Sequence, residues 1–141
     1  SISIPVTDES KLPEIGLTDQ SEKIVYSRLK DILRVAGTAE FAGFNHSVKK
    51  TRIESLKRLA MTLFPEGGDY DNILEWACLR PQTPDGCAII GETPYKNLIL
   101  NTGHGTLGWT LGAGSAKIVA DIAEGKEPEI SLDGLTMQRF K

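Results

Sequence analysis

LRPQTPDG (residues 79–86) and GHGTLGW (residues 103–109) are the two stretches that decide the fold and the site predicted for this chain. Pro81 keeps Arg80 extended, because a residue before proline is disfavoured in the helical region. An arginine held at a strand end can clamp a carboxylate, and a glycine-rich helix entrance lets backbone N–H groups approach a planar or anionic ligand. Together the two stretches predict a site for a substrate and a cofactor.

Alternating hydrophobic residues predict several short strands around these stretches. They cover residues 1–6, 24–29, 32–44, 72–80, 87–91 and 97–101. The second and third are expected to form a hairpin with a two-residue turn at Lys30 and Asp31. Glycines inside the third strand indicate a bulge or a close backbone approach. Alternation over 72–80 puts Arg80 on the same face as Trp76.

Two helices are predicted from apolar residues at a spacing of three to four. The first follows Ser47 as its N-cap and ends at Pro65, and the second covers about 107–124 and ends at Gly125. His46, just before the first helix, is expected to face solvent. Strands and one helix, followed by a strand, a turn and a helix, predict an α+β fold.

The composition is that of an ordinary globular protein. The chain has 141 residues, 40% hydrophobic and 25% charged, and its net charge of −3 gives no electrostatic reason to expect nucleic acid as a partner. Cys78 and Cys87 form neither a disulfide framework nor a metal cluster, and are expected as a core thiol and a strand thiol in a reducing compartment. No apolar run approaches the roughly 20 residues that span a bilayer, so any membrane association is expected to be peripheral.

Five glycines between positions 103 and 114 weaken the start of the second helix, at about 1 kcal/mol for each one within it. Close packing of the helix on a sheet could offset this cost, but close approach of a ligand is the favoured explanation. Gly103, Gly105 and Gly108 also match the G-x-G-x-x-G pattern of a dinucleotide-binding loop. A pyrophosphate cradle is disfavoured, because no convincing second parallel strand follows the helix.

Residues 79–91 (LRPQTPDGCAIIG), 97–122 and 32–45 closely resemble the C-terminal part of a family of amino acid-oxidising flavoenzymes. The family includes D-amino acid dehydrogenase, glycine oxidase, sarcosine oxidase and D-amino acid oxidase. Ala88 departs from its pattern, where proline is expected. The resemblance covers nearly the whole chain, and the combined spacing of the two motifs is specific.

The resemblance implies a mixed, mainly antiparallel substrate-binding sheet with a helix over residues 1–96. Residues 97–141 would supply the last strand and helix of a Rossmann-like FAD domain. The N-terminal FAD-binding half would be absent, so the chain is expected to be a fragment that is inactive alone. Apolar surface exposed by such a division is expected to make the fragment self-associate.

The resemblance also implies the roles of individual residues. Arg80 would grip the substrate carboxylate, and the glycine loop would face the flavin ring, with the helix N-terminus at the pyrimidine edge. The residues expected to contact FAD are Gly103, His104, Gly105, Thr106, Leu107, Gly108, Trp109 and Thr110. His104 is expected to act through its backbone N–H, and no catalytic acid, base or metal is assigned. Trp109 is expected either in the core or as a wall of the ligand pocket.

The implied activity is oxidative deamination of D-amino acids, such as D-alanine, to 2-oxo acids and ammonia. Electrons would pass from FAD to a respiratory acceptor, so the protein is expected in the cytoplasm or on the inner face of a bacterial membrane. One alternative is an oxidase acting on glycine or sarcosine, which differs in acceptor and pocket. The other is a carboxylate-binding or subunit-docking module without chemistry of its own.

Overall fold

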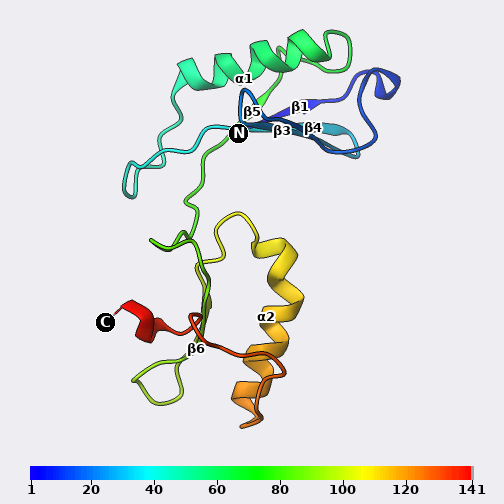
Figure 1. Ribbon diagram of the computed structural model, residues 1–141. Helices are drawn as coiled ribbons and strands as arrows, with labels where there is room; N and C mark the ends of the chain where they lie inside the picture. The colour runs from blue at the N-terminus through cyan, green and yellow to red at the C-terminus, as the bar shows by residue number, and fades with distance from the viewer. Residues whose placement is uncertain (141) are drawn as a thin grey trace. The chain divides into compact units, whose positions relative to one another are not determined.

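The computed structural model describes residues 1–140 and divides the chain into two compact units, Ser1–Leu79 and Arg80–Lys141. Antiparallel sheets and two helices make up the fold, which confirms the predicted α+β class (Figure 1). The expected boundary between residues 96 and 97 lies inside the second of these compact units.

The first unit is built on a five-stranded antiparallel sheet. Its order is β2 (Leu17–Asp19), β3 (Ile24–Leu29), β4 (Ile32–Ala36), β1 (Ile2–Pro5) and β5 (Leu74–Glu75). A short helical turn, η1 (Glu9–Lys11), connects β1 to β2. β3 and β4 form the predicted hairpin, since Leu29 pairs with Ile32 across the two-residue turn.

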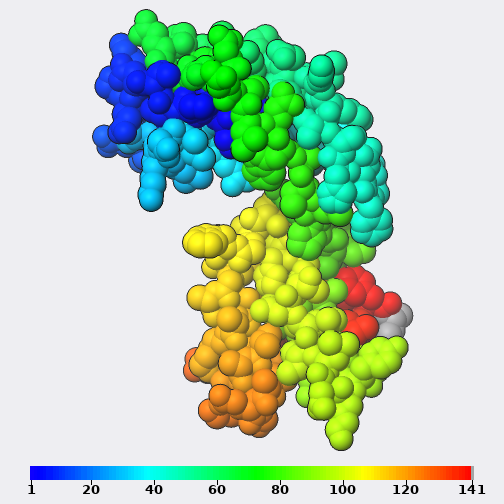
Figure 2. Space-filling view, turned by 180° about the vertical axis from the view of Figure 1, so that it is seen from behind, coloured from blue at the N-terminus to red at the C-terminus, as the bar shows by residue number. Residues whose placement is uncertain are grey.

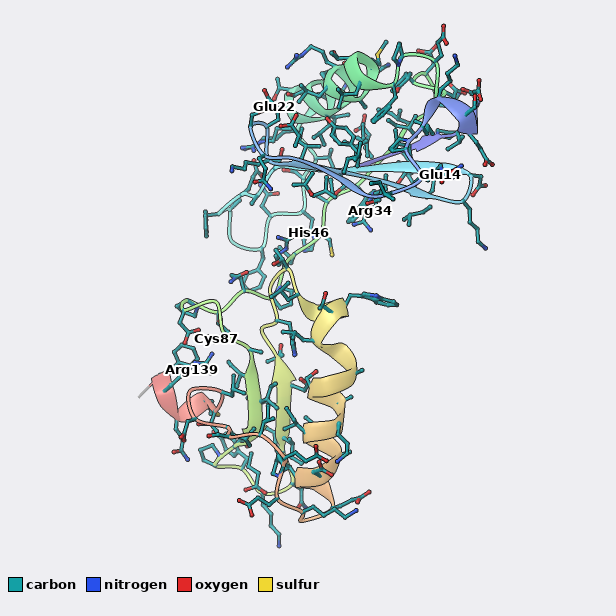
Figure 3. The ribbon with its side chains drawn as sticks, turned by 45° about the vertical axis from the view of Figure 1, so that its right-hand side comes forward. Glu14, Glu22, Arg34, His46, Cys87 and Arg139 are labelled. Atoms are coloured by element: carbon teal, nitrogen blue, oxygen red, sulfur yellow. The ribbon has the colours of Figure 1, made fainter. Side chains whose placement is uncertain are left out.

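Helix α1 (Lys50–Leu63) covers one face of this sheet (Figure 1). Its helical spacing buries Ile53, Leu56 and Ala60 against alternate residues of the strands. The buried strand residues are Ile2, Ile4, Ile24, Tyr26, Leu33 and Val35. The opposite face of the sheet carries Arg34, whose guanidinium lies 4.6 Å from the Trp76 ring centroid (Figure 3).

The N-terminal end of α1 differs from the prediction. Lys49 is the N-cap, without a side-chain capping bond, so the assignment of Ser47 to this role is wrong. The Ser47 N–H instead donates to Asn45 Oδ1 at 2.8 Å, in a local turn that competes with capping. His46 is exposed, as predicted.

Strand β4 ends at Ala36, so the prediction that it extends to residue 44 is wrong. Thr38 has a φ of 69°, which turns the chain out of the sheet. The predicted close backbone approach is confirmed at Gly37. A Cβ there would lie 2.8 Å from Ile24 Cγ1 and 3.0 Å from Leu56 Cδ2.

Strand β5 (Leu74–Glu75) is also shorter than the predicted 72–80. The Trp76 N–H donates to Ser1 O at 3.1 Å, and residues 77–80 lie outside the sheet. Cys78 is therefore exposed rather than in the core. Cys87 is exposed as well and precedes its strand, so both cysteine assignments are wrong.

The second unit packs one helix on a two-stranded sheet. β6 (Ile89–Glu92) pairs antiparallel with β7 (Ile99–Thr102), and α2 (Gly108–Ala123) lies along them (Figure 1). Its core is small, with Ala88, Ile90 and Ile118 buried. The chain then returns to β6 through a hydrogen bond from Ile90 N–H to Leu135 O at 2.8 Å, and η2 (Met137–Phe140) follows. Within residues 1–140, no helix is long and apolar enough to cross a membrane.

Replacing a core leucine of the first unit should destabilise it far more than replacing a surface leucine of the same hairpin. Leu33 is 0% exposed and Leu29 is 49% exposed. We expect Leu33→Ala to lower the free energy of unfolding by about 2–5 kcal/mol, because it removes buried methyl groups and leaves a cavity. Leu29→Ala should cost less than about 1 kcal/mol. Equal effects in urea denaturation of the chain would contradict the described core.

Candidate functional site

The two sequence stretches that predicted the site are joined by main-chain atoms in the second unit. Gln82 and His104 form an isolated antiparallel bridge, and the Gly105 N–H donates to Pro81 O at 3.0 Å. Arg80 therefore directly precedes a carbonyl group that is hydrogen-bonded to the glycine loop. Because the link is made by backbone groups, it does not depend on any side-chain rotamer.

Two glycines of the loop permit this contact. Gly103 has a φ of 75°, and a Cβ there would lie 2.6 Å from Cγ2 of the buried Thr83. Thr83 is stiff at χ1 and its hydroxyl is hydrogen-bonded to Cys87 O, so it cannot easily move aside. Gly105 has a φ of 57°, and its Cβ would meet only the mobile end of Gln82. At position 103 both the lack of space for a Cβ and the positive φ require glycine. At position 105 only the positive φ requires it.

The entrance of α2 leaves its first amide groups open. Leu107 is the N-cap, without a side-chain capping bond, and the first turn has no acidic residue. Among the described residues, no hydrogen bond is formed by the N–H groups of Gly108, Trp109 and Thr110. The uncapped amides and the positive end of the helix dipole can bind an anion or an electron-rich edge of a planar ligand.

Arg80 and Trp109 both have free side chains in this unit. Arg80 is exposed, and no described residue forms an ion pair with its guanidinium. Trp109 is 99% exposed, so the alternative of a core position is wrong within this unit. Figure 2 shows the segment that begins α2, in yellow, with side chains projecting from the surface. Thr106 and Leu107 are exposed as well.

His104 is the one predicted site residue whose ring is partly enclosed. Its Nε2 is buried and has no hydrogen-bond partner among the described residues. A buried polar atom without a partner is unfavourable, at about 1–3 kcal/mol.

The glycines inside α2 are not explained by packing on the sheet. A Cβ placed at Gly112 or Gly114 has no other atom within 4 Å, and at Gly108 the nearest is His104 Cβ at 3.5 Å. Close helix-to-sheet packing, the less favoured explanation of these glycines, is therefore wrong within this unit. The backbone at Gly112 and at Gly114 is therefore open to close approach, from different sides of the helix because the two positions are two residues apart.

The candidate site is an open surface in this chain. Two hollows of the molecular surface lie elsewhere, one over α1 beside Arg58 and one between residues 92–99 and the end of α2. Neither includes Arg80 or the glycine loop. Within residues 1–140, no group of three or more His, Cys, Asp and Glu side chains could hold a metal ion.

Sequence reasoning missed Gln82 and Thr83, which contact the glycine loop. Both lie between the Arg80–Pro81 pair and Asp85, in a stretch whose local pattern indicates only a turn. Their role depends on pairing with residues about twenty positions away, which no local pattern indicates.

Comparison with known proteins gives this chain relatives. A family profile described as FAD dependent oxidoreductase matches residues 2–122. The D-amino acid dehydrogenase of Paramagnetospirillum magneticum is 49% identical over 140 residues, and those of Methylobacterium radiotolerans and Bradyrhizobium diazoefficiens are each 46% identical. These matches cover 99% of this chain but only 33% of each relative, so the chain spans about a third of their length.

A solved structure shares the fold. The crystal structure of glycine oxidase from Geobacillus kaustophilus matches with a TM-score of 0.78, covering 98% of this chain and 38% of its own. The sequence identity is 24%, so this likeness concerns the fold alone.

Alanine substitution should destabilise the protein more at Gly103, where the new Cβ would meet a neighbour, than at Gly43, where only the backbone dihedral is unfavourable. Gly103 and Gly43 both have positive φ, 75° and 59°, but a Cβ at Gly43 would have no atom within 4 Å. We expect Gly43→Ala to lower the free energy of unfolding by about 1 kcal/mol or less. Gly103→Ala should cost at least about 1 kcal/mol more, because it must also displace Thr83. Equal costs in thermal or urea unfolding would argue against the described contact.

Proposed function

The chain belongs to the FAD dependent oxidoreductase family, and from this premise we propose that it forms the C-terminal part of a D-amino acid dehydrogenase. In the proposed reaction a D-amino acid would be oxidised to an imino acid, which hydrolyses to a 2-oxo acid and ammonia, and FAD, held by residues 103–110, would supply the two-electron acceptor. The observation that carries the proposal is the backbone link between Pro81 and Gly105. It joins a segment suited to bind a carboxylate to a loop suited to face a flavin.

Arg80 is the proposed substrate-binding residue. Its guanidinium can bind a carboxylate through two parallel hydrogen bonds, which orient the substrate as well as attract it. Orientation of the Cα–H bond toward the acceptor is a large part of what this reaction requires from the protein. The free, exposed guanidinium supports this role, since no described residue neutralises it.

The glycine loop and the first turn of α2, residues 103–110, are proposed to hold the flavin. Their open amides, the two glycines with positive φ and the unpaired His104 Nε2 fit a planar, polar ring system. FAD would supply the redox chemistry, and the protein would supply orientation and charge stabilisation. The positive end of α2 would stabilise negative charge at the pyrimidine edge by about 0.3–2 kcal/mol.

The remaining partners of the proposed enzyme lie outside this chain. The part of the relatives' length that it does not span is proposed to bind the adenine half of FAD. On this proposal, residues 1–96 contribute the substrate-binding sheet and helix, and residues 97–141 the last strand and helix of the FAD domain. A respiratory acceptor on the inner face of a bacterial membrane would receive the electrons.

Removing the proposed carboxylate clamp should affect substrate binding and spare the flavin. In the full-length protein, we expect Arg80→Leu to raise KM for D-alanine by about 10- to 100-fold, because a charge-assisted hydrogen bond contributes about 1.5–3 kcal/mol. FAD content, read from the visible spectrum, should not change. Arg58→Leu, at an exposed position of α1, is the control and should leave KM unchanged. An unchanged KM in the Arg80 variant would refute the clamp.

The proposed electron acceptor can be tested by reoxidation. We expect the full-length enzyme, reduced anaerobically with D-alanine, to react slowly with oxygen and rapidly with a quinone in stopped-flow measurements. The reason is that a dehydrogenase passes its electrons to a respiratory acceptor. Rapid reoxidation by oxygen would favour a glycine- or sarcosine-type oxidase instead.

A further inference from the structure

Arg139, in the C-terminal turn η2, binds the segment that follows Arg80. Its Nε donates to Asp85 Oδ2 at 2.6 Å and its Nη2 to Asp85 Oδ1 at 3.2 Å, a bidentate pair between residues 54 positions apart. Nη2 also donates to Cys87 O at 2.6 Å, and Nη1 to Thr136 O at 3.1 Å. Figure 3 shows Arg139 beside Cys87.

This pair is more restrictive than an ordinary surface ion pair. The Arg139 side chain is only 14% exposed, and its guanidinium lies 4.3 Å from the Phe140 ring centroid. Hydrogen bonds from Arg139 hold the pKa of Asp85 well below its usual range, and the Cys87 N–H donates to the same carboxylate at 3.1 Å. An isolated surface ion pair contributes little stability, but a bidentate arginine fixes the direction of the carboxylate it binds.

The clamped turn continues directly into the candidate site. Thr83 Oγ1 donates at 2.8 Å to Cys87 O, the same carbonyl that Arg139 binds. The methyl group of Thr83 lies against Gly103, and the next residue toward the N-terminus, Gln82, bridges to His104. Arg139 therefore acts on the turn that carries the link between the Arg80 segment and the glycine loop.

We propose that Arg139 is a positioning residue for substrate binding: it fixes Arg80 relative to the glycine loop by holding Asp85 and the Cys87 carbonyl. This inference rests on the proposed function. Arg139 lies outside residues 2–122, the range matched by the family profile. Without this support, the 82–87 turn can shift, and the guanidinium of Arg80 loses its alignment with the flavin-facing loop.

The kinetic test uses the full-length, FAD-loaded protein with D-alanine. We expect Arg139→Met and Asp85→Asn each to raise KM by about tenfold, because Arg80 would no longer be held in position to bind the substrate carboxylate. The value of kcat should stay within about threefold of that of the wild-type protein. Arg139→Lys should recover less than half of this effect, since lysine keeps the charge but not the fork. Lys117→Met, which removes the Lys117–Asp121 ion pair on α2, is the matched control and should leave KM unchanged.

A second readout does not depend on activity. In the same variants, hydrogen exchange of the Cys87 and Gly105 amides is measured by mass spectrometry without substrate. We expect exchange to accelerate by about fivefold or more in Arg139→Met and not in Lys117→Met, with melting temperature and FAD content unchanged. Unchanged exchange, unchanged KM, or a general loss of stability and FAD would each overturn the positioning role. If the wild-type protein does not oxidise D-amino acids, the proposed function fails, and amide exchange alone decides whether Arg139 holds the loop.

Discussion

The hydrogen bond from Gly105 N–H to Pro81 O is the interaction on which the candidate site depends. Pro81 cannot donate a hydrogen bond, so its carbonyl is its only main-chain polar group, and the loop uses it. Gly103 and Gly105 can form this contact because both adopt positive φ. The bond thereby connects the residue next to Arg80 with the entrance of α2. Two segments that are far apart in sequence are thereby hydrogen-bonded to each other.

The two units differ in the size of their hydrophobic cores, and the candidate site lies in the unit with the smaller core. In the first unit, period-two strands and a period-3.6 helix bury nine side chains, and Leu12 and Tyr70 complete the same core. The second unit buries only Ala88, Ile90 and Ile118 in its core. Polar links therefore carry more of its geometry, among them the Gln82–His104 bridge and the Arg139–Asp85 pair. Directional bonds define the orientation of the segments that they join.

The elements that could be predicted from sequence are those with a complete local pattern. Alternation around Lys30 and Asp31 predicted the β3–β4 hairpin, and helical spacing predicted α1 and α2 to within a few residues. The combined motifs also led to the family. The predicted end of β5 was wrong, because the length of a strand depends on pairing with a distant part of the chain and not on local alternation alone. Ser47 has the side chain of a helix cap, but its amide is bonded to Asn45 in a turn that precedes the helix.

The sequence indicated the two segments of the candidate site but not the residue that holds one of them in place. Arg80 and the glycine loop each carry a local signature, whereas Arg139 has none and is linked to Asp85 only by folding. Trp109 is an example of a residue whose type misleads. A large aromatic residue predicts burial, but Trp109 is exposed in the described unit. Its roles as pocket wall or as contact with FAD, and those of Thr106 and Leu107, stay predictions.

A crystal structure of the full-length protein with FAD and a carboxylate that cannot be oxidised, such as benzoate, would show whether Arg80 and residues 103–110 form one site. We expect the carboxylate to accept two hydrogen bonds from Arg80 and residues 103–110 to lie against the flavin ring. A structure with Arg80 directed into bulk solvent, or with the glycine loop away from the ring, would contradict this expectation.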